Sequence, residues 1–267
     1  MSYRIKKVFS NNKKKLITFV TGGDPNKKTS TEILETIIKN GADIVEIGMP
    51  FSDPMADGPT IQLSSNRAIK NGANLNTIFD ISKSLRKKNN NIPIILMGYY
   101  NVILHYGIKK FVKKCSDSGV DGLIIVDLQP EEDSDLYNEI KSYNIDLIRL
   151  ITPTSTTKRI KIITSHASGF LYYVTITGIT GQKSGDIEEL KKSIKNIKNY
   201  SNLPIVAGFG INNKKQVKEV CKITDGAVVG SSIVKIIEKK LKNKNVMLKN
   251  IKNLISNLKK GTVVWIG

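Results

Sequence analysis

Three carboxylates lie close together in the segment EIGMPFSDPMADGP (46–59), whose prolines and glycines restrict the backbone. Glu46 ends the apolar run ADIVEI, whereas Asp53 and Asp57 lie in the loop that follows. A carboxyl group beside apolar neighbours loses solvation, which raises its pKa and lets it transfer protons near neutral pH. We expect Asp57 to be better solvated and therefore anionic. Two carboxylates in unlike surroundings favour two roles, in which one moves a proton and the other stabilises positive charge.

Each of these acids also has a purely structural alternative. Glu46 could form a buried ion pair with a lysine or an arginine. Asp53 precedes a proline and Asp57 precedes a glycine, so both could stabilise turns. The spacing alone leaves the catalytic and the structural interpretations open.

Other chemistries find less support in the residue types. Asp24, Glu46 and Asp127 could meet and bind Mg²⁺, but we expect no metal site. His105 and His166 belong to no HxH or HExxH pattern. No lysine stands at the end of a predicted strand, which disfavours a Schiff-base aldolase, and no serine or cysteine has the sequence context of an activated nucleophile.

Short apolar runs alternate with longer segments of helical periodicity along the chain. The runs predict strands at 16–20, 43–47, 92–97, 122–126, 146–150, 170–174, 204–208 and 226–230. The periodicity predicts helices at 29–40, 76–88, 107–118, 131–143, 156–165, 188–200, 213–223 and, as one long helix, from Ser232 onward. Because the strands are continuously apolar, both of their faces should be buried, as is typical of parallel sheets.

Consecutive strand–helix units in a chain of 267 residues favour a closed (β/α)8 TIM barrel that forms a single domain over residues 1–267. An open doubly wound sheet is the alternative. The dinucleotide-binding pattern GxGxxG that often follows the first strand of such a sheet is absent, since TGGD (21–24) does not match it. The active site of a barrel lies at the carboxyl ends of its strands.

Glycine-bearing loops follow the last three predicted strands, at 177–181, 208–210 and 230–232. Glycine lets backbone N–H groups approach an anion closely. Ser231 and Ser232 would begin the last helix, whose N-terminus attracts negative charge. Ordinary turns and a serine cap are the alternative to a binding site. The predicted phosphate-binding residues are Gly181, Gly210, Gly230 and Ser231.

The formal net charge of +19 raises the possibility of nucleic-acid binding. The lysines are spread along nearly the whole chain, however, and aromatic residues make up only 6% of it. We therefore expect a solvated basic surface and no nucleic-acid partner. No apolar run is long enough to span a membrane. The N-terminal segment does not resemble a secretory signal, and Cys115 and Cys221 are too isolated to suggest a disulfide, so we expect a cytoplasmic protein.

Several segments together resemble one enzyme family over nearly the whole chain. They are FVTGGDP (19–25), EIGMPFSDPMADGPTIQ (46–62), GYYNVI (98–103), YYVTITGITG (172–181), GFGI (208–211) and DGAVVGSSIVKIIE (225–238). The chain is similar in these segments to the alpha subunit of tryptophan synthase. The resemblance implies an α/β barrel that acts as a lyase in tryptophan biosynthesis and cleaves indole-3-glycerol phosphate to indole and D-glyceraldehyde 3-phosphate. It also implies that the alpha subunit needs neither a metal nor a cofactor.

The same resemblance implies roles for individual residues. Glu46 would be the acid and base of the reaction, and Asp57 would stabilise positive charge at the indole nitrogen. Substrate-binding positions would be Phe19, Met97, Tyr172, Thr180 and Phe209. Asp53 and Asn101 would face a beta subunit in an αββα heterotetramer.

Two other functions remain open at this stage. The chain could be a cofactor-free isomerase of sugar phosphates, for which Asp57 should matter little. It could also be a noncatalytic basic protein, which would bind nucleic acid with a steep dependence on salt.

Overall fold

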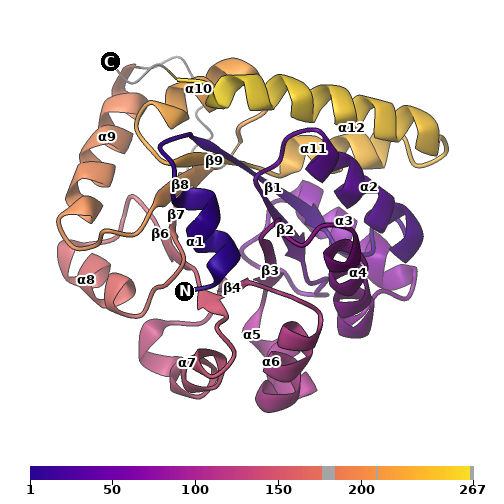
Figure 1. Cartoon of the computed structure of the whole chain (residues 1–267), viewed down its shortest axis with the longest axis horizontal. Coiled ribbons are helices and arrows are strands. Elements are labelled where there is room, and N and C mark those ends of the chain that lie inside the picture. The colour runs from indigo at the N-terminus through magenta and orange to yellow at the C-terminus, as the bar shows by residue number, and fades with distance from the viewer. Residues whose placement is uncertain (176–183, 209, 265–267) are drawn as a thin grey trace.

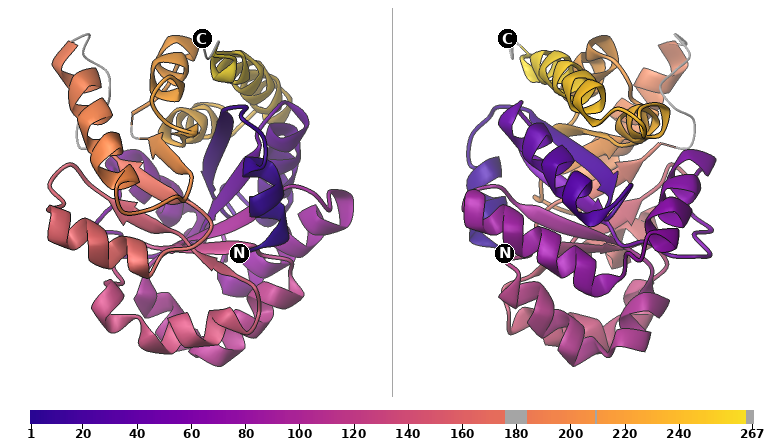
Figure 2. Two further views of the ribbon diagram at one scale, coloured as in Figure 1. Left: turned by 60° about the vertical axis from the view of Figure 1, so that its left-hand side comes forward. Right: turned by 90° about the vertical axis from the view of Figure 1, so that its right-hand side faces the viewer.

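The computed structural model describes residues 1–175, 184–208 and 210–264. Parallel strands form a ring at its centre, and helices form a layer around the ring (Figures 1 and 2). The strands are β1 (Lys15–Thr21), β2 (Ile44–Gly48), β3 (Ile94–Gly98), β4 (Gly122–Ile125), β5 (Asp146–Leu147), β6 (Arg149–Ile151), β7 (Leu171–Val174), β8 (Ile205–Gly208) and β9 (Gly226–Val229).

The sheet closes on itself. Its hydrogen-bonded order is β5-β4-β3-β2-β1-β9-β8-β7-β6, and the two ends of this series are adjacent in the chain. Only Ile148 separates β5 from β6, and its backbone N–H donates to the carbonyl of Leu123 over 2.9 Å. The two short strands therefore occupy the place of the single strand predicted at 146–150. This closure confirms the (β/α)8 barrel and excludes the open doubly wound sheet.

Most predicted helices are present with shifted ends. The helices that correspond to predictions are α2 (Lys27–Lys39), α4 (Leu75–Lys88), α6 (Ile108–Asp117), α7 (Ser134–Lys141), α8 (Thr157–Ser165), α9 (Ser184–Lys198), α10 (Lys214–Cys221) and α11 (Ser231–Lys239). The further helical segments are α1 (Tyr3–Phe9), α3 (Pro59–Lys70), α5 (Tyr100–Tyr106), η1 (Pro130–Glu132), α12 (Lys244–Lys259) and η2 (Lys260–Thr262).

The prediction of one long helix from Ser232 onward is wrong. The chain turns after α11, and a second helix, α12, begins after Asn243, whose side-chain oxygen accepts the N–H of Val246 over 3.1 Å. An asparagine that caps in this way satisfies a helix N–H group that has no partner within the helix. The helix α12 then packs along α2 (Figure 1).

Two apolar cores stabilise the barrel. One lies between the strands and the outer helices, and the other fills the interior of the ring. The interior core includes Ile17, Ile44, Ile95, Ile124, Ile148, Phe170, Val206 and Val228. The helix α1 lies across one end of the barrel (Figure 1), where Ile5 is fully buried and Phe9 contacts Phe170 with 5.7 Å between ring centroids.

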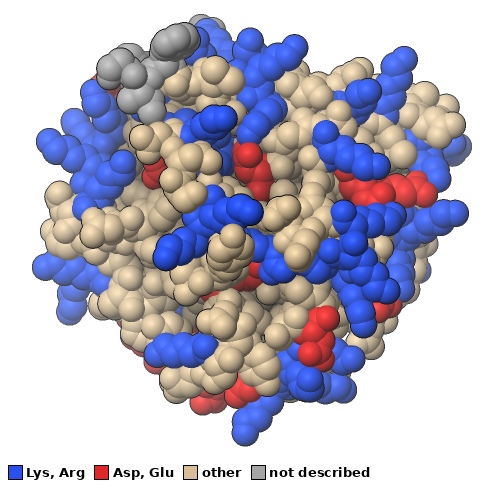
Figure 3. Space-filling view, in the orientation of Figure 1, with Lys and Arg blue, Asp and Glu red and all other residues tan. Residues whose placement is uncertain are grey.

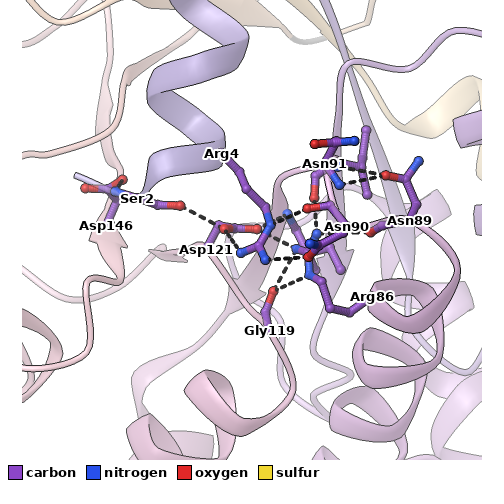
Figure 4. A network of polar contacts seen from close by, with 11 residues as sticks. Ser2, Arg4, Arg86, Asn89, Asn90, Asn91, Gly119, Asp121 and Asp146 are labelled. Atoms are coloured by element: carbon purple, nitrogen blue, oxygen red, sulfur yellow. Dashed lines mark hydrogen bonds and ion pairs between the residues drawn. The ribbon is translucent and has the colours of Figure 1, made fainter.

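A polar network at the same end ties strands to helices (Figure 4). Asp121, which precedes β4, is 2% exposed. Its carboxylate accepts from Arg4 over 3.1 Å, from Arg86 of α4 over 2.7 Å, from the Ser2 hydroxyl over 2.8 Å and from the backbone N–H of Ile94 over 2.9 Å. Because the catalytic end of a barrel is the opposite one, this network serves stability.

We therefore expect Asp121→Ala to destabilise the fold strongly. The change would leave Arg86 and the N–H of Ile94 without their carboxylate partner in a buried place, a loss that costs about 3–5 kcal/mol. Unfolding in urea, followed by circular dichroism, measures the effect. The control is Asp117→Ala, which removes an exposed ion pair to Lys113 and should cost less than about 1 kcal/mol. Equal losses in the two variants would contradict the role given to the network.

Candidate active site

The alternation of residues along the strands determines which side chains point into the barrel mouth. Successive residues of a strand point to opposite sides, so every second residue faces the interior. Ile44 of β2 lies in the interior core, and Glu46, two positions later, therefore faces the interior nearer to the carboxyl end. Phe19, Met97, Tyr172 and Gly230 also stand two positions after a residue of the interior core, so they face the interior at the same end of the barrel.

A cavity of about 690 Å³ opens at this end of the barrel. Such a volume is typical of sites for small organic molecules. The cavity brings together most of the residues predicted from the sequence as catalytic, substrate-binding or phosphate-binding. Those that line it are Phe19, Glu46, Asp57, Met97, Tyr172, Gly210, Gly230 and Ser231.

Two other predicted residues, Asp53 and Asn101, do not line this cavity. Asp53 and Asn101 are both exposed on the surface. Asp53 lies beside Met55, which is 86% exposed, and Asn101 lies near Leu104, which is 53% exposed. Thr180, Gly181 and Phe209 lie outside the residues that the structure describes.

Glu46 is a buried carboxyl group, and the described part of the chain places no neutralising partner beside it. The residue is 1% exposed, and neither of its oxygens has a hydrogen-bond partner among the described residues. Burial raises the pKa of the carboxyl to about 8. Within the described chain the structural alternative of a buried ion pair is therefore wrong. A carboxyl of this kind is largely protonated at neutral pH and can act as an acid.

Asp57 has different surroundings. Its side chain is partly exposed, and its Oδ2 accepts a hydrogen bond from the Tyr99 hydroxyl over 3.1 Å. Burial raises the pKa of this carboxyl, and the hydrogen bond from Tyr99 opposes the increase. The backbone of Asp57 is fixed as well, since its N–H donates to Pro54 over 3.0 Å and its carbonyl accepts from Gln62 over 2.9 Å.

The helix α3 follows Asp57 directly and was not predicted. Gly58 occupies its N-cap position and Pro59 its first turn, a combination that favours the start of a helix. The cap is not made by the Asp57 side chain, which points to Tyr99 instead. The positive end of the α3 dipole lies next to Asp57 and favours its anionic form.

The described part of the chain contains no cluster of three acidic, histidine or cysteine side chains that could hold a metal ion. The three acids considered for Mg²⁺ do not form such a cluster, and two of them have other partners. Asp24 accepts from Arg67 of α3 at both oxygens, over 3.0 and 2.9 Å, and Asp127 accepts from the backbone N–H of Tyr100 over 2.8 Å. Glu46 alone of the three lines the cavity.

Gly210, Gly230 and Ser231, three of the residues predicted to bind phosphate, line the cavity. Gly210 has a φ of +71°, which side chains other than glycine rarely adopt. Gly230 lies against the Phe19 ring, where an added Cβ would come within 3.2 Å of Phe19 carbons. Ser231 begins α11, so the first N–H groups of this helix face the region that Gly210 and Gly230 border.

Lys235 also lines the cavity and was not predicted. It lies one helical turn after Ser231, so a helical projection of α11 would have placed both residues on one face. The two arginines of the cavity, Arg149 and Arg159, form ion pairs with Asp133 and Glu131. Within residues 1–175, 184–208 and 210–264, Lys235 has no ion pair.

A second cavity, of about 330 Å³, lies at the amino ends of the strands. Lys13, Lys14 and Lys198 line it together with Asp225, which is paired with Lys14 over 3.5 Å. Because barrel enzymes carry out their chemistry at the carboxyl ends of the strands, the larger cavity is the candidate active site.

A closed parallel barrel with two unlike carboxyl groups in a cavity at the strands' carboxyl ends defines the class of (β/α)8-barrel enzymes. The family model described as "Tryptophan synthase alpha chain" matches residues 5–263. The chain belongs to the tryptophan synthase alpha chain family.

Individual relatives agree with this assignment. A tryptophan synthase alpha chain of Methanocaldococcus jannaschii is 48% identical over 228 residues, which cover 85% of this chain and 81% of the relative. That of Petrotoga mobilis is 43% identical over 262 residues, which cover 98% and 99%. The crystal structure of tryptophan synthase subunit alpha from Legionella pneumophila has a TM-score of 0.90 and 33% identity, with 98% of each chain covered.

We expect Glu46→Gln to change how stability depends on pH. The pKa of Glu46 is raised from 4.5 to about 8 in the folded chain, so the unfolded chain loses this proton first. The carboxyl therefore destabilises the native state progressively as pH rises from about 4.5 to about 8. Glutamine stays neutral, so the variant should be more stable by about 2–5 kcal/mol above pH 8 and similar to the parent near pH 4.

Thermal unfolding midpoints between pH 4 and 9 measure this difference. Glu132→Gln, at an exposed position of η1, is the control and should follow the parent at every pH. A stability difference that stays constant with pH would show that Glu46 does not titrate in this range.

Proposed function

We propose that this chain is a lyase that cleaves indole-3-glycerol phosphate to indole and D-glyceraldehyde 3-phosphate, the alpha reaction of L-tryptophan biosynthesis. The observation that carries the proposal is the carboxyl of Glu46, which has no partner among the described residues and is buried in the wall of a cavity that Asp57 also lines. Membership of the tryptophan synthase alpha chain family supports the same reaction.

In the proposed first step, protonated Glu46 donates its proton to the indole ring carbon that bears the side chain. The raised pKa of Glu46, about 8, supports this role because the acid form predominates at neutral pH. The ring becomes a cationic indolenine with its positive charge at nitrogen. Asp57, as an anion, stabilises that charge.

In the proposed second step, the Glu46 carboxylate takes the proton of the hydroxyl group next to the ring. The carbon–carbon bond breaks, and its electron pair restores the aromatic indole. The hydroxyl-bearing carbon becomes the aldehyde of glyceraldehyde 3-phosphate. Glu46 ends protonated, as it began, so one carboxyl group balances both proton transfers.

The cavity supports a separate place for each end of the substrate. Phe19 and Met97 offer apolar surface for the indole ring, and Tyr172 stands on β7, which pairs with β8, the strand that leads to Gly210. The phosphate would bind at Gly210, Gly230 and Ser231, where helix α11 begins. We extend the substrate-binding proposal to Thr180 and Phe209, and the phosphate site to Gly181, on the family resemblance alone.

We also propose that the chain forms one domain, works in the cytoplasm and assembles with a beta subunit through the face that carries Asp53 and Asn101. The name of the Legionella relative, a subunit alpha, supports a larger assembly. Cys115 and Cys221 are buried and unpaired, which is compatible with a reducing compartment. Among the described helices, none is long and apolar enough to cross a membrane.

The proposed function does not require the basic surface to bind nucleic acid. On the face shown in Figure 3, lysine and arginine side chains are scattered over many elements and are interrupted by acidic and neutral ones. Binding along a nucleic-acid backbone favours a continuous basic band instead.

Glu46→Gln should lower kcat for indole release about 10²–10⁴-fold, because glutamine can neither donate nor accept the transferred proton. Indole is measured after incubation of the purified chain with indole-3-glycerol phosphate, alone and with a beta subunit. Glu132→Gln, the exposed control, should keep the parental rate. If the parent chain instead converts open-chain sugar phosphates and releases no indole under either condition, the isomerase hypothesis replaces the lyase.

Lys235→Gln should raise KM for indole-3-glycerol phosphate about 2- to 5-fold and leave kcat nearly unchanged. An exposed lysine attracts the phosphate equally in the bound substrate and in the transition state, and one such charge contributes modestly. The effect should shrink at high salt. Lys239→Gln, one turn further along α11 and away from the cavity lining, is the matched control. A loss confined to kcat would contradict a binding role for Lys235.

A further inference from the structure

Tyr99 lies at the end of β3, directly before α5, and is almost completely buried, with 4% of its surface exposed. A phenol hydroxyl in such a place needs hydrogen-bond partners, because an unsatisfied buried polar group costs free energy. Both partners of this hydroxyl belong to the loop that carries the second proposed catalytic residue.

The Tyr99 oxygen accepts the backbone N–H of Ala56 over 3.0 Å. The same oxygen lies 3.1 Å from Oδ2 of Asp57. Tyr99 is also the only side chain that hydrogen-bonds the Asp57 carboxyl within the described residues. One hydroxyl group thus contacts two consecutive residues of the loop.

These two contacts determine the direction of the second hydrogen bond. A backbone N–H can only donate, so the Tyr99 oxygen is an acceptor toward Ala56 and its own hydrogen remains available for Asp57. If Asp57 were protonated at Oδ2 and donated to Tyr99, the phenol hydrogen would lose its partner. The arrangement therefore requires Oδ2 of Asp57 to be an unprotonated acceptor, as it is in the carboxylate.

The tyrosine ring supports the loop from a second direction. It packs on Phe51, at the start of the same loop, with 5.1 Å between ring centroids and an angle of 32° between planes. Gly98, the residue before Tyr99, lies so close to Met49 that an added Cβ would come within 2.7 Å of the Met49 side chain. The strand end that carries Tyr99 and the loop that carries Asp57 are therefore packed against each other.

We propose that Tyr99 is a positioning residue, which holds the Asp57 carboxylate in the cavity in its charged form through one hydrogen bond. The inference rests on the proposed function, since it assigns to Asp57 the stabilisation of positive charge. It adds a residue that lies outside the cavity lining and acts only through Asp57.

Other charged groups lie near Asp57 and Tyr99, and the variants described below leave them unchanged. Glu46, Arg149, Arg159 and Lys235 line the cavity with Asp57, and the negative charge of Asp127 acts on Tyr99 from the β4 side. The hydrogen bond from Tyr99 lowers the pKa of Asp57 against the effect of burial. Its removal should therefore raise that pKa.

Tyr99→Phe tests the proposal, because phenylalanine keeps the ring contact with Phe51 and removes only the hydroxyl. We expect kcat for indole release to fall about 5- to 10-fold, the factor of one lost hydrogen bond. The acidic limb of the kcat profile should move to higher pH. Carbon-13 NMR of the Asp57 carboxyl, assigned by its absence in Asp57→Asn, should show the same direction of shift without any substrate.

A second variant tests the opposite direction. Site-specific 3-fluorotyrosine at position 99 has a more acidic phenol and is a stronger donor, so the Asp57 signal should titrate at lower pH than in the parent. Tyr106→Phe is the matched control. It removes a hydroxyl that donates to Asn76 over 3.0 Å at the other end of α5, and it should leave both the pH profile and the Asp57 signal unchanged.

The outcomes separate this inference from the proposed function. A parent chain that releases no indole would defeat the proposed function, while the NMR titration would still test the contact between Tyr99 and Asp57. The inference is overturned if the Asp57 titration is the same in the parent, Tyr99→Phe and fluorotyrosine chains. It is also overturned if Tyr99→Phe lowers kcat by the same factor in an Asp57→Asn background, since a purely structural role would act without Asp57.

Discussion

Closure of the parallel strands into a ring is the constraint on which the rest of the structure depends. In a closed barrel each strand has two fixed neighbours, so its residues cannot exchange their inward and outward directions. Ile44 and Glu46 must then both face the interior, one deep inside and one at the mouth. Backbone pairing also sets Phe19 opposite Glu46. The position of the acid is thus a consequence of strand register rather than of contacts made by its own side chain.

The two proposed catalytic carboxyls differ because the elements that carry them differ. Glu46 belongs to a strand whose residues are all buried, so no solvent and no described donor reaches its oxygens. Asp57 belongs to a loop beside a helix N-terminus and a tyrosine hydroxyl, both of which favour negative charge. At one pH, Glu46 can therefore be protonated while Asp57 is ionised.

The barrel, Glu46 and the glycines after the last strands could be predicted from the sequence, because apolar periodicity and strand-end position are local properties. The roles of Phe19, Met97 and Tyr172, and that of Asp57 at the indole nitrogen, were expected only from the family resemblance. Glu46 could be found in this way, since it ends an apolar run. The contact between Tyr99 and Asp57 could not, because it joins two loops whose distance depends on the packing of β2 against β3. The end of α11 was missed for a related reason. Its sequence stays helical in composition, and the turn before Asn243 is fixed by the packing of α12 on α2.

Glu46 differs from the other buried acids discussed above in having no cation beside it among the described residues. Asp121 and Asp133 are each about as buried as Glu46, yet each is neutralised by an arginine. Asp24, near the mouth, is paired with Arg67 in the same manner. A buried charge without a partner costs several kcal/mol, so a fold that depended only on stability would pair or replace Glu46 as well. That Glu46 has no such partner in the described chain, in the cavity at the carboxyl ends of the strands, is the physical reason to assign it a chemical role.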